Sequence, residues 1–361
     1  MSNEFWRNKK VFITGHTGFK GGWLSLWLND LGANVTGFSL LPSTSPSFFD
    51  VCSVDSSVKS IIGDVRDYVR LKKSIQDESP DIVFHMAAQA LVLDSYIDPV
   101  ATYETNLMGT VNILNALRET PSVKAFINIT SDKCYENIEK YSGYTEEDRM
   151  GGFDPYSSSK GCAELITAAY RASFFNSSLY LDHGVGIATA RSGNVIGGGD
   201  WSSNRLIPDI FEAILLKKAI TIRNPSSTRP WQHVLEPLSG YLNLAEKLFL
   251  EGVDFSESWN FGPSTNDVQT VQDVATKFIS QWGSNTQINL ENNSSQPHEA
   301  TLLTLDCSKA ADRLHWTPKM NTKDAIRITC DWYKMFNEGK SDMKLFSLDQ
   351  IKSYQSVFIK R

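Results

Sequence analysis

Short β-rich runs alternate with helical segments along the first half of this 361-residue chain, and this alternation constrains the fold more than any other feature. Two segments with helical periodicity are Trp23–Leu31 and Thr110–Arg118. The candidate strands are Val11–Gly15, Asn34–Leu40, Val58–Gly63, Asp81–Ala87, Ala125–Ile129 and Gly186–Arg191. Strands that alternate with helices indicate βαβ units. We therefore predict an α/β fold with a Rossmann-like, doubly wound parallel sheet.

After this series the chain becomes richer in glycine, proline, asparagine and serine. We predict that residues 1–190 form the sheet domain and that a later segment, about 230–258, returns to it. Residues 191–361 then form mainly a smaller, discontinuous α/β domain. Loop-rich stretches are expected at 197–199, 223–230 and 284–297, and the tail from Met343 to Arg361 carries mixed signals.

Composition excludes several classes of protein. Lys and Arg number 35 against 41 Asp and Glu, and this net charge of -6 argues against a general affinity for nucleic acid or anionic membranes. No apolar run approaches the roughly 18 residues of a membrane helix, and the polar N-terminus does not resemble a signal peptide. Five widely spaced cysteines without a C-x-x-C pair predict reduced thiols in the cytoplasm. The six histidines show no metal-ligand spacing, so we predict no metal.

A glycine loop connects the first strand to the first helix. Glycines three residues apart allow a tight turn and let backbone N–H groups at a helix N-terminus approach a pyrophosphate. The alternative is a plain strand-to-helix turn, but the βαβ series behind the loop favours a dinucleotide site. The predicted cofactor-binding residues of the loop are Gly15, Thr17, Gly18, Phe19, Lys20 and Gly21.

The second strand lacks the acidic residue that usually binds the adenosine ribose. Ser39 offers only a hydroxyl at this point, and no arginine for a 2′-phosphate lies directly there, which favours NAD over NADP. Asp64, at the end of the third strand, is a candidate partner for the adenine edge, although it could equally cap its own loop.

Two further motifs carry catalytic residue types. Tyr156 and Lys160 lie four apart on one face of a predicted helix whose first turn holds Pro155. A lysine ammonium beside the phenol would favour the phenolate, which could accept a hydroxyl proton. Upstream, Ser131-Asp132-Lys133 closes the fifth strand, at the sheet edge where α/β proteins bind ligands.

These three motifs, in this order, resemble those of an extended short-chain dehydrogenase/reductase that modifies nucleotide sugars, specifically the CDP-glucose 4,6-dehydratases. The resemblance covers Val11 to about Trp332. It is strongest in Gly15–Gly21, Thr130–Asn137, Asp154–Lys160, Gly193–Trp201 and Arg229–Val234. It implies bound NAD, a CDP-glucose substrate, a 4-keto-6-deoxy product, a bacterial surface-sugar (O-antigen) pathway and a homodimer or homotetramer.

The resemblance also assigns roles to residues. Tyr156 would take the C4 hydroxyl proton, Ser131 would hydrogen-bond the same oxygen, and Lys160 would bind the cofactor ribose. Asp132, protonated, would deliver a proton to the departing C6 hydroxyl, and Lys133 would remove the C5 proton. Further cofactor contacts are expected at Val65, Ala87, Ala88, Gln89 and Asn106.

One residue departs from the wider dehydratase pattern. Relatives that act on dTDP-glucose carry Thr-Asp-Glu where this chain has Ser131-Asp132-Lys133, a change that the CDP-glucose branch shows. An ammonium cannot accept a proton, so Lys133 would need a lowered pKa, which desolvation near Lys160 and the nicotinamide ring would favour.

The substrate side requires cations and donors for a nucleotide diphosphate. Arg229 is the best candidate, because a guanidinium fork matches phosphate oxygens. The Gly197–Gly199 run would let backbone approach a ligand, or would simply form a flexible turn. Second-rank candidates are Asn194, Arg205, Arg223 and His298, each of which could instead be a surface residue.

Three other functions are compatible with parts of this pattern. A 4-epimerase needs the tyrosine and NAD but no elimination pair, so Asp132 and Lys133 argue against it. A dehydratase for another nucleotide remains an alternative. A non-catalytic NAD sensor on the same fold should lack the Tyr156–Lys160 pair.

Overall fold

The computed structural model describes residues 3–265, 267–290 and 302–358. Its strands are β1 (Lys10–Thr14), β2 (Asn34–Ser39), β3 (Lys59–Ile62), β4 (Ile82–His85), β5 (Ala125–Ile129), β6 (Gly186–Ser192), β7 (Val195–Ile196), β8 (Ile220–Ile222), β9 (Thr228–Arg229), β10 (Gln232–His233), β11 (Ser258–Phe261), β12 (Gln269–Thr270) and β13 (Ile288–Leu290). Its α-helices are α1 (Asn3–Trp6), α2 (Phe19–Asp30), α3 (Phe48–Val51), α4 (Tyr68–Glu78), α5 (Val92–Ile97), α6 (Pro99–Tyr103), α7 (Gly109–Leu117), α8 (Pro155–Ser173), α9 (Tyr180–His183), α10 (Leu206–Leu215), α11 (Leu235–Glu251), α12 (Val271–Trp282), α13 (Ser308–Leu314), α14 (Thr322–Glu338) and α15 (Met343–Phe358).

A seven-stranded sheet forms the centre of the molecule, with strand order β11-β6-β5-β4-β1-β2-β3. Every neighbouring pair in it is parallel. The order reverses between β1 and β4, and such a switch point opens a crevice at the carboxyl edge where ligands bind. The predicted α/β fold with a doubly wound parallel sheet is confirmed.

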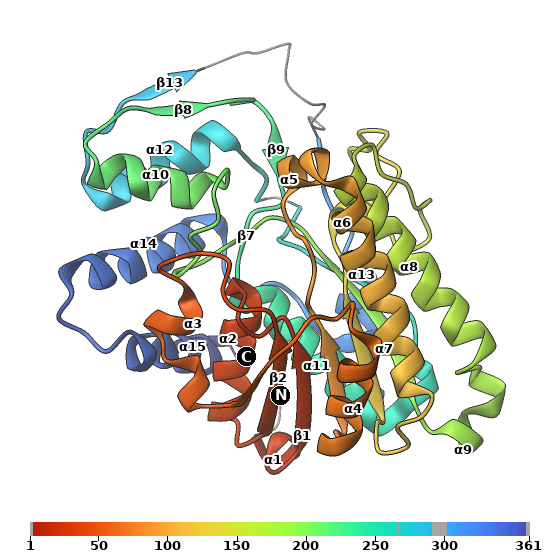
Figure 1. Cartoon of the computed structure of the whole chain (residues 1–361). Coiled ribbons are helices and arrows are strands. Elements are labelled where there is room, and N and C mark those ends of the chain that lie inside the picture. Colours follow the sequence, from red (N-terminus) through yellow and green to blue (C-terminus); the bar gives the residue numbers. More distant parts are fainter. Residues whose placement is uncertain (1–2, 266, 291–301, 359–361) are drawn as a thin grey trace.

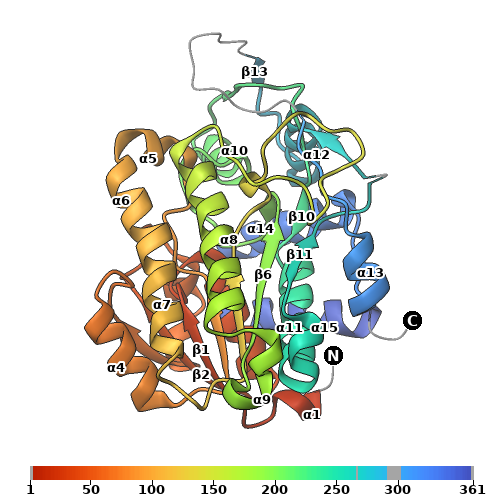
Figure 2. The ribbon, with the colours of Figure 1, turned by 90° about the vertical axis from the view of Figure 1, so that its right-hand side faces the viewer.

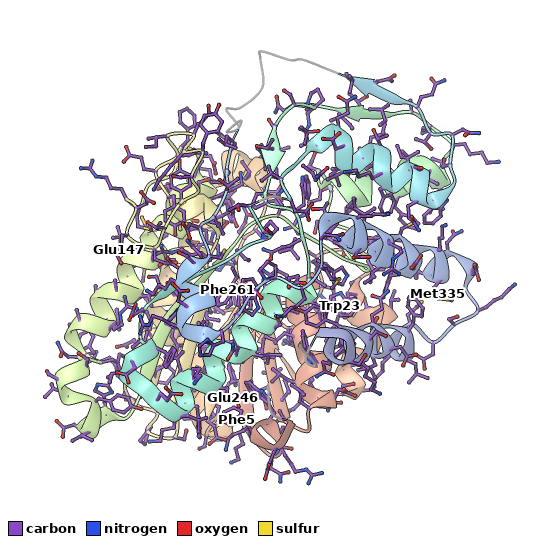
Figure 3. All side chains as sticks on the ribbon, turned by 180° about the vertical axis from the view of Figure 1, so that it is seen from behind. Phe5, Trp23, Glu147, Glu246, Phe261 and Met335 are labelled. Atoms are coloured by element: carbon purple, nitrogen blue, oxygen red, sulfur yellow. The ribbon has the colours of Figure 1, made fainter. Side chains whose placement is uncertain are left out.

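Alternating side chains of the strands build two cores. Val11 and Ile13 of β1 pack into the core that includes α2 and α11, whereas Phe12 packs into the core that includes α4 and α7. Figure 2 shows α4, α7 and α8 on one side of the strands and α11 and α15 on the other. Trp23 and Phe261, labelled in Figure 3, are fully buried members of the first core.

A smaller unit lies beyond the carboxyl edge of the sheet, in the upper part of Figure 1. It contains α10, α12 and the short strand pairs β8–β13 and β9–β12, and α14 packs against α12. The chain returns to the sheet with α11 and β11. The proposed division into two domains at residue 190 remains a prediction.

Several expected boundaries change. The helix expected from Trp23 is α2, which begins at Phe19, directly after Gly18. The tail left without a predicted element forms α15, and its Tyr354 is buried against α2 and α11. The stretches expected to be loops at 223–230 and 284–297 contain β9 and β13, because each pairs with a strand distant in sequence.

Within the described residues, no helix is both long enough and apolar enough to cross a bilayer.

Candidate active site

The glycine loop is packed too closely for side chains at two positions. Gly15 has φ +82°, and a Cβ there would lie 2.7 Å from the backbone nitrogen of Ala87. A Cβ on Gly21 would lie 2.1 Å from the carbonyl oxygen of Gly15. Gly18 is the N-cap of α2 and has no side chain to accept hydrogen bonds from the first N–H groups of the helix. These N–H groups therefore face the loop. This cradle fits a pyrophosphate, the part of a dinucleotide that a helix N-terminus binds.

Hydroxyls replace the missing carboxylate after β2. Ser39 Oγ lies 2.9 Å from Thr17 Oγ1, which also donates to the carbonyl oxygen of Leu40.

The imidazole of His16 fills the space beside Gly37, where a Cβ would lie 2.1 Å from the ring. Burial lowers the pKa of His16 to about 4, so the ring is neutral at physiological pH.

Asp64 is engaged within its own loop. Arg66 contacts its carboxylate at 2.7 Å, and the backbone N–H of Arg66 donates to Asp64 Oδ1. The hydrogen bonds from Arg66 lower the pKa of Asp64. The loop-cap alternative therefore describes the ligand-free protein, and a contact with adenine stays a prediction.

The other expected cofactor contacts lie after β3, after β4 and, for Asn106, in the helical turn Glu104–Met108. Asn106 Nδ2 donates to the carbonyl oxygen of Gln89 and to Ser159 Oγ on α8, at 3.0 and 2.8 Å. Val65 is buried, whereas Ala87 and Ala88 are half-buried. Asn106 thus ties the cofactor side of the site to the helix that carries Tyr156.

The end of β5 presents the predicted acid. Ser131 Oγ donates to Asp132 Oδ1 at 3.0 Å and accepts from the backbone N–H of Lys133 at 3.2 Å. Asp132 Oδ2 is buried and makes no hydrogen bond within the described part of the chain. Burial raises the pKa of Asp132, which favours the protonated form that a general acid needs.

Tyr156 and Lys160 lie on the first turns of α8, which Asp154 caps at the N-terminus and Pro155 begins, as predicted. Burial raises the pKa of Tyr156 to about 12, opposed by a hydrogen bond with Ser131 and the charge of Arg205. Lys160 Nζ donates to the carbonyl oxygen of Ile129, at 3.2 Å. In the ligand-free protein the phenol is therefore protonated, because burial destabilises the phenolate by more than Ser131 and Arg205 stabilise it. The phenolate expected during the reaction stays a prediction.

Sequence reasoning missed the surroundings of Lys20. Its Nζ is buried and donates to Ser192 Oγ at 2.9 Å and to Tyr241 Oη at 3.1 Å. Burial, reinforced by Arg205, lowers the pKa of Lys20 to about 7. A lysine in the loop was visible in the sequence, but its partners come from β6 and α11, far along the chain.

The predicted arginines differ in their positions. Arg205 lies at the start of α10 and contacts Asp200 at 3.1 Å, and its positive charge opposes the rise in the pKa of Tyr156. Arg229 is buried, and its positive charge opposes the rise in the pKa of Asp132. Arg223 contacts Asn204 more weakly, at 3.5 Å. The predicted Asn194 follows β6, where its backbone carbonyl accepts from Gln232. His298 lies outside the described residues.

Aromatic rings pack against the glycine run. A Cβ on Gly198 would lie 2.0 Å from Trp332, and one on Gly199 would lie 2.4 Å from Phe48. These glycines therefore allow close packing within the protein, and a contact of their backbone with a ligand stays a prediction. Within the described residues, no group of three or more histidine, cysteine or acidic side chains could hold a metal ion.

The fold and site together define an enzyme of the short-chain dehydrogenase/reductase class, with a dinucleotide cradle, a Tyr/Lys pair and an adjacent acid at one sheet edge. Residues 12–329 match the family model described as GDP-mannose 4,6 dehydratase. The chain belongs to this family of nucleotide-sugar dehydratases and epimerases.

Comparison with individual proteins identifies more specific relatives within this family. The chain is 50% identical over 357 residues to a CDP-glucose 4,6-dehydratase of Salmonella typhimurium, covering 99% of both chains. This confirms the resemblance seen in the motifs. A CDP-paratose 2-epimerase of Salmonella typhi is 25% identical over 90% of this chain and 98% of its own. A solved dTDP-glucose 4,6-dehydratase of Bacillus anthracis, in complex with NAD, shares the fold with a TM-score of 0.76 at 21% identity, covering 91% of this chain and 98% of its own.

Proposed function

We propose that this protein catalyses the NAD-dependent dehydration of CDP-D-glucose to CDP-4-dehydro-6-deoxy-D-glucose. The observation that carries the proposal is the buried Asp132, held by Ser131 beside Tyr156, because an elimination needs an acid that an epimerisation does not. The 50% identity to the Salmonella typhimurium enzyme along the full chain supports the nucleotide.

Each residue of the site has a separate role in the proposed reaction. NAD held in the cradle around Gly15 would supply the hydride acceptor for C4 of the glucose and the hydride donor for C6. Tyr156 takes the proton of the C4 hydroxyl, which Ser131 orients, and Lys160 binds the ribose of the cofactor. The C4 ketone makes the C5 proton acidic, Lys133 removes it, and Asp132 protonates the departing C6 hydroxyl. The elimination releases one water. Because the hydride would return to the sugar, the overall reaction involves no net oxidation.

The two sides of the site hold the two ligands. The cradle around Gly15, with Thr17, Ser39, Asp64 and the residues after β4, would bind NAD. Arg229 would bind the diphosphate of the substrate, and Asn194, Arg205, Arg223 and His298 are further candidates for contacts with the substrate.

The wider setting is also part of the proposal. We infer a cytoplasmic homodimer or homotetramer that supplies deoxyhexoses for a bacterial surface polysaccharide, the O-antigen. Sedimentation of the purified protein would decide the number of subunits.

Mass spectrometry tests the reaction. The protein is incubated with NAD and CDP-, dTDP-, UDP- or GDP-linked hexoses in separate tubes. We expect a product 18 mass units lighter from CDP-glucose alone, without accumulation of NADH. An isomer of unchanged mass would instead assign a 4-epimerase, and water loss only from another nucleotide would assign a different dehydratase.

A further inference from the structure

A buried ion pair lies directly beneath the catalytic residues. Arg191, on β6, contacts Glu164, on α8, at 2.7 Å, and both side chains are less than 5% exposed. The proposed reaction assigns no role to either residue. Because a buried ion pair costs desolvation energy and often adds no stability over apolar packing, its presence requires another explanation.

The carboxylate of Glu164 joins the elements that carry the catalytic groups. Thr130, which directly precedes Ser131, donates to Glu164 Oε1 at 2.5 Å. Thr189 of β6 donates to Oε2 at 2.7 Å, as does Arg191. Glu164 also lies one helical turn beyond Lys160, so it shares a face of α8 with the Tyr/Lys pair.

The guanidinium of Arg191 extends the network to the opposite side. It donates to Tyr135 Oη at 2.8 Å, and Tyr135 in turn donates to Asn260 Oδ1 on β11. Asn260 Nδ2 then donates to the carbonyl oxygens of Tyr144 and Asp306. Thr130, which precedes Asp132, and Tyr135, which follows it, are therefore both hydrogen-bonded to this ion pair.

We propose that Glu164 and Arg191 are positioning residues for the dehydration, which hold the Ser131–Lys133 segment against α8 and place a buried carboxylate one helical turn beyond Lys160. This inference rests on the proposed function. It predicts that the pair acts on the chemical step rather than on the binding of substrate or cofactor.

Charges around Lys160 explain why a carboxylate is needed there. Burial and the charge of Lys20 together lower the pKa of Lys160 to about 8, and the charge of Glu164 opposes both. His85 and Cys134 also face the amine from β4 and from the turn after β5. Burial lowers the pKa of His85 to about 3 and raises that of Cys134, so both are neutral. Among the described residues that act on this lysine, Glu164 is thus the one that carries a negative charge.

Four variants test the proposal. Glu164→Gln keeps the shape and removes the charge. Thr130→Val and Thr189→Val each remove one hydrogen bond to the same carboxylate, but only Thr130 adjoins Ser131. Glu236→Gln is the matched control, because Glu236 is a buried acidic residue that accepts hydrogen bonds from Lys319, Met320 and Tyr354, none of which belongs to the proposed site.

The readouts are kcat, KM for CDP-glucose, NAD affinity by fluorescence and the pH dependence of kcat. For Glu164→Gln we expect kcat to fall at least tenfold, KM and NAD affinity to stay within about threefold, and the alkaline limb to move to lower pH by about one unit. Thr130→Val should lower kcat more than Thr189→Val without moving the limb. Glu236→Gln should change none of these.

The outcomes separate the two proposals. If the parent does not dehydrate CDP-glucose, the proposed function fails and this inference fails with it. If the parent is active but the alkaline limb is unmoved in Glu164→Gln, the role of the charge is refuted. If Glu164→Gln does not fold, the threonine pair decides the positioning role, and equal kcat values in Thr130→Val and Thr189→Val would overturn it.

Discussion

Replacing Lys20 by methionine tests whether this buried amine makes the stability of the protein depend on pH. Burial lowers the pKa of Lys20 from 10.5 to about 7 in the folded state. The unfolded chain keeps the ordinary value, so between about pH 7 and 10.5 it holds a proton that the folded protein lacks. The parent should therefore gain stability as pH rises through this window and lose it as pH falls.

The magnitude follows from the shift. Each unit of pKa corresponds to about 1.4 kcal/mol, so the full shift from 10.5 to about 7 corresponds to ~5 kcal/mol. Because the folded amine is half protonated at pH 7, the gain in unfolding free energy between pH 7 and 9 is about 2 kcal/mol. Methionine has a similar length, and Ser192 and Tyr241 keep their own 2.7 Å hydrogen bond, so the variant should fold and lack this dependence.

Urea unfolding followed by tryptophan fluorescence measures the effect on the ligand-free protein at pH 7, 8 and 9. The difference between parent and Lys20→Met should change by about 2 kcal/mol across this range. Lys247→Met is the control, because Lys247 pairs with Glu251 at the surface, and its difference from the parent should stay constant. Parallel pH dependences of parent and Lys20→Met would refute the reasoning, since they would show that the folded amine keeps its proton.

Three further substitutions have defined outcomes. Asp132→Asn should slow water loss at least a hundredfold while NAD affinity stays within about threefold, and equal dehydration rates would remove Asp132 from the mechanism. Tyr156→Phe should abolish turnover measured by mass spectrometry yet leave the thermal stabilisation by NAD intact; retained turnover would assign the proton transfer to another group. Gly198→Ala should lower the unfolding free energy by about 2 kcal/mol, because its Cβ would lie 2.0 Å from Trp332, and an unchanged melting temperature would mean that the ring moves freely.

The sheet was predictable because each strand and helix carries its own local pattern. Ala125–Ile129 was placed without error, and the other five predicted strands of the sheet differ from the observed ones by one or two residues at their ends. The helix at Met343–Phe358 was not predicted, because its buried residues contact distant elements rather than following a clear apolar stripe. Strands as short as β9 carry too few residues for a pattern.

The candidate site was predictable where a motif is contiguous and not where partners are distant. The loop around Gly15 and the Tyr156–Lys160 pair were recognisable from their spacing together with the βαβ series around them and their order along the chain. The contact of Lys20 with Tyr241 joins residues 221 positions apart, which no local pattern reveals. Arg191 did offer a signal, since a charged residue within an apolar strand requires a buried partner. The state of Tyr156 could not be read from spacing either, because burial depends on the complete fold.

The packing around the glycine run has a consequence for how the chain folds during synthesis. Trp23 donates to the carbonyl oxygen of Gly198, 175 residues away, and stacks on Phe48, whose ring also faces Trp332 of α14. The thiol of Cys52 donates a hydrogen bond to the backbone carbonyl oxygen of Met343, 291 residues further on. Helix α2 therefore lacks part of its apolar cover until the last two helices leave the ribosome. Contacts of such separation slow folding, so nascent chains should expose Trp23 and Phe48 for most of translation and depend on chaperones during that interval.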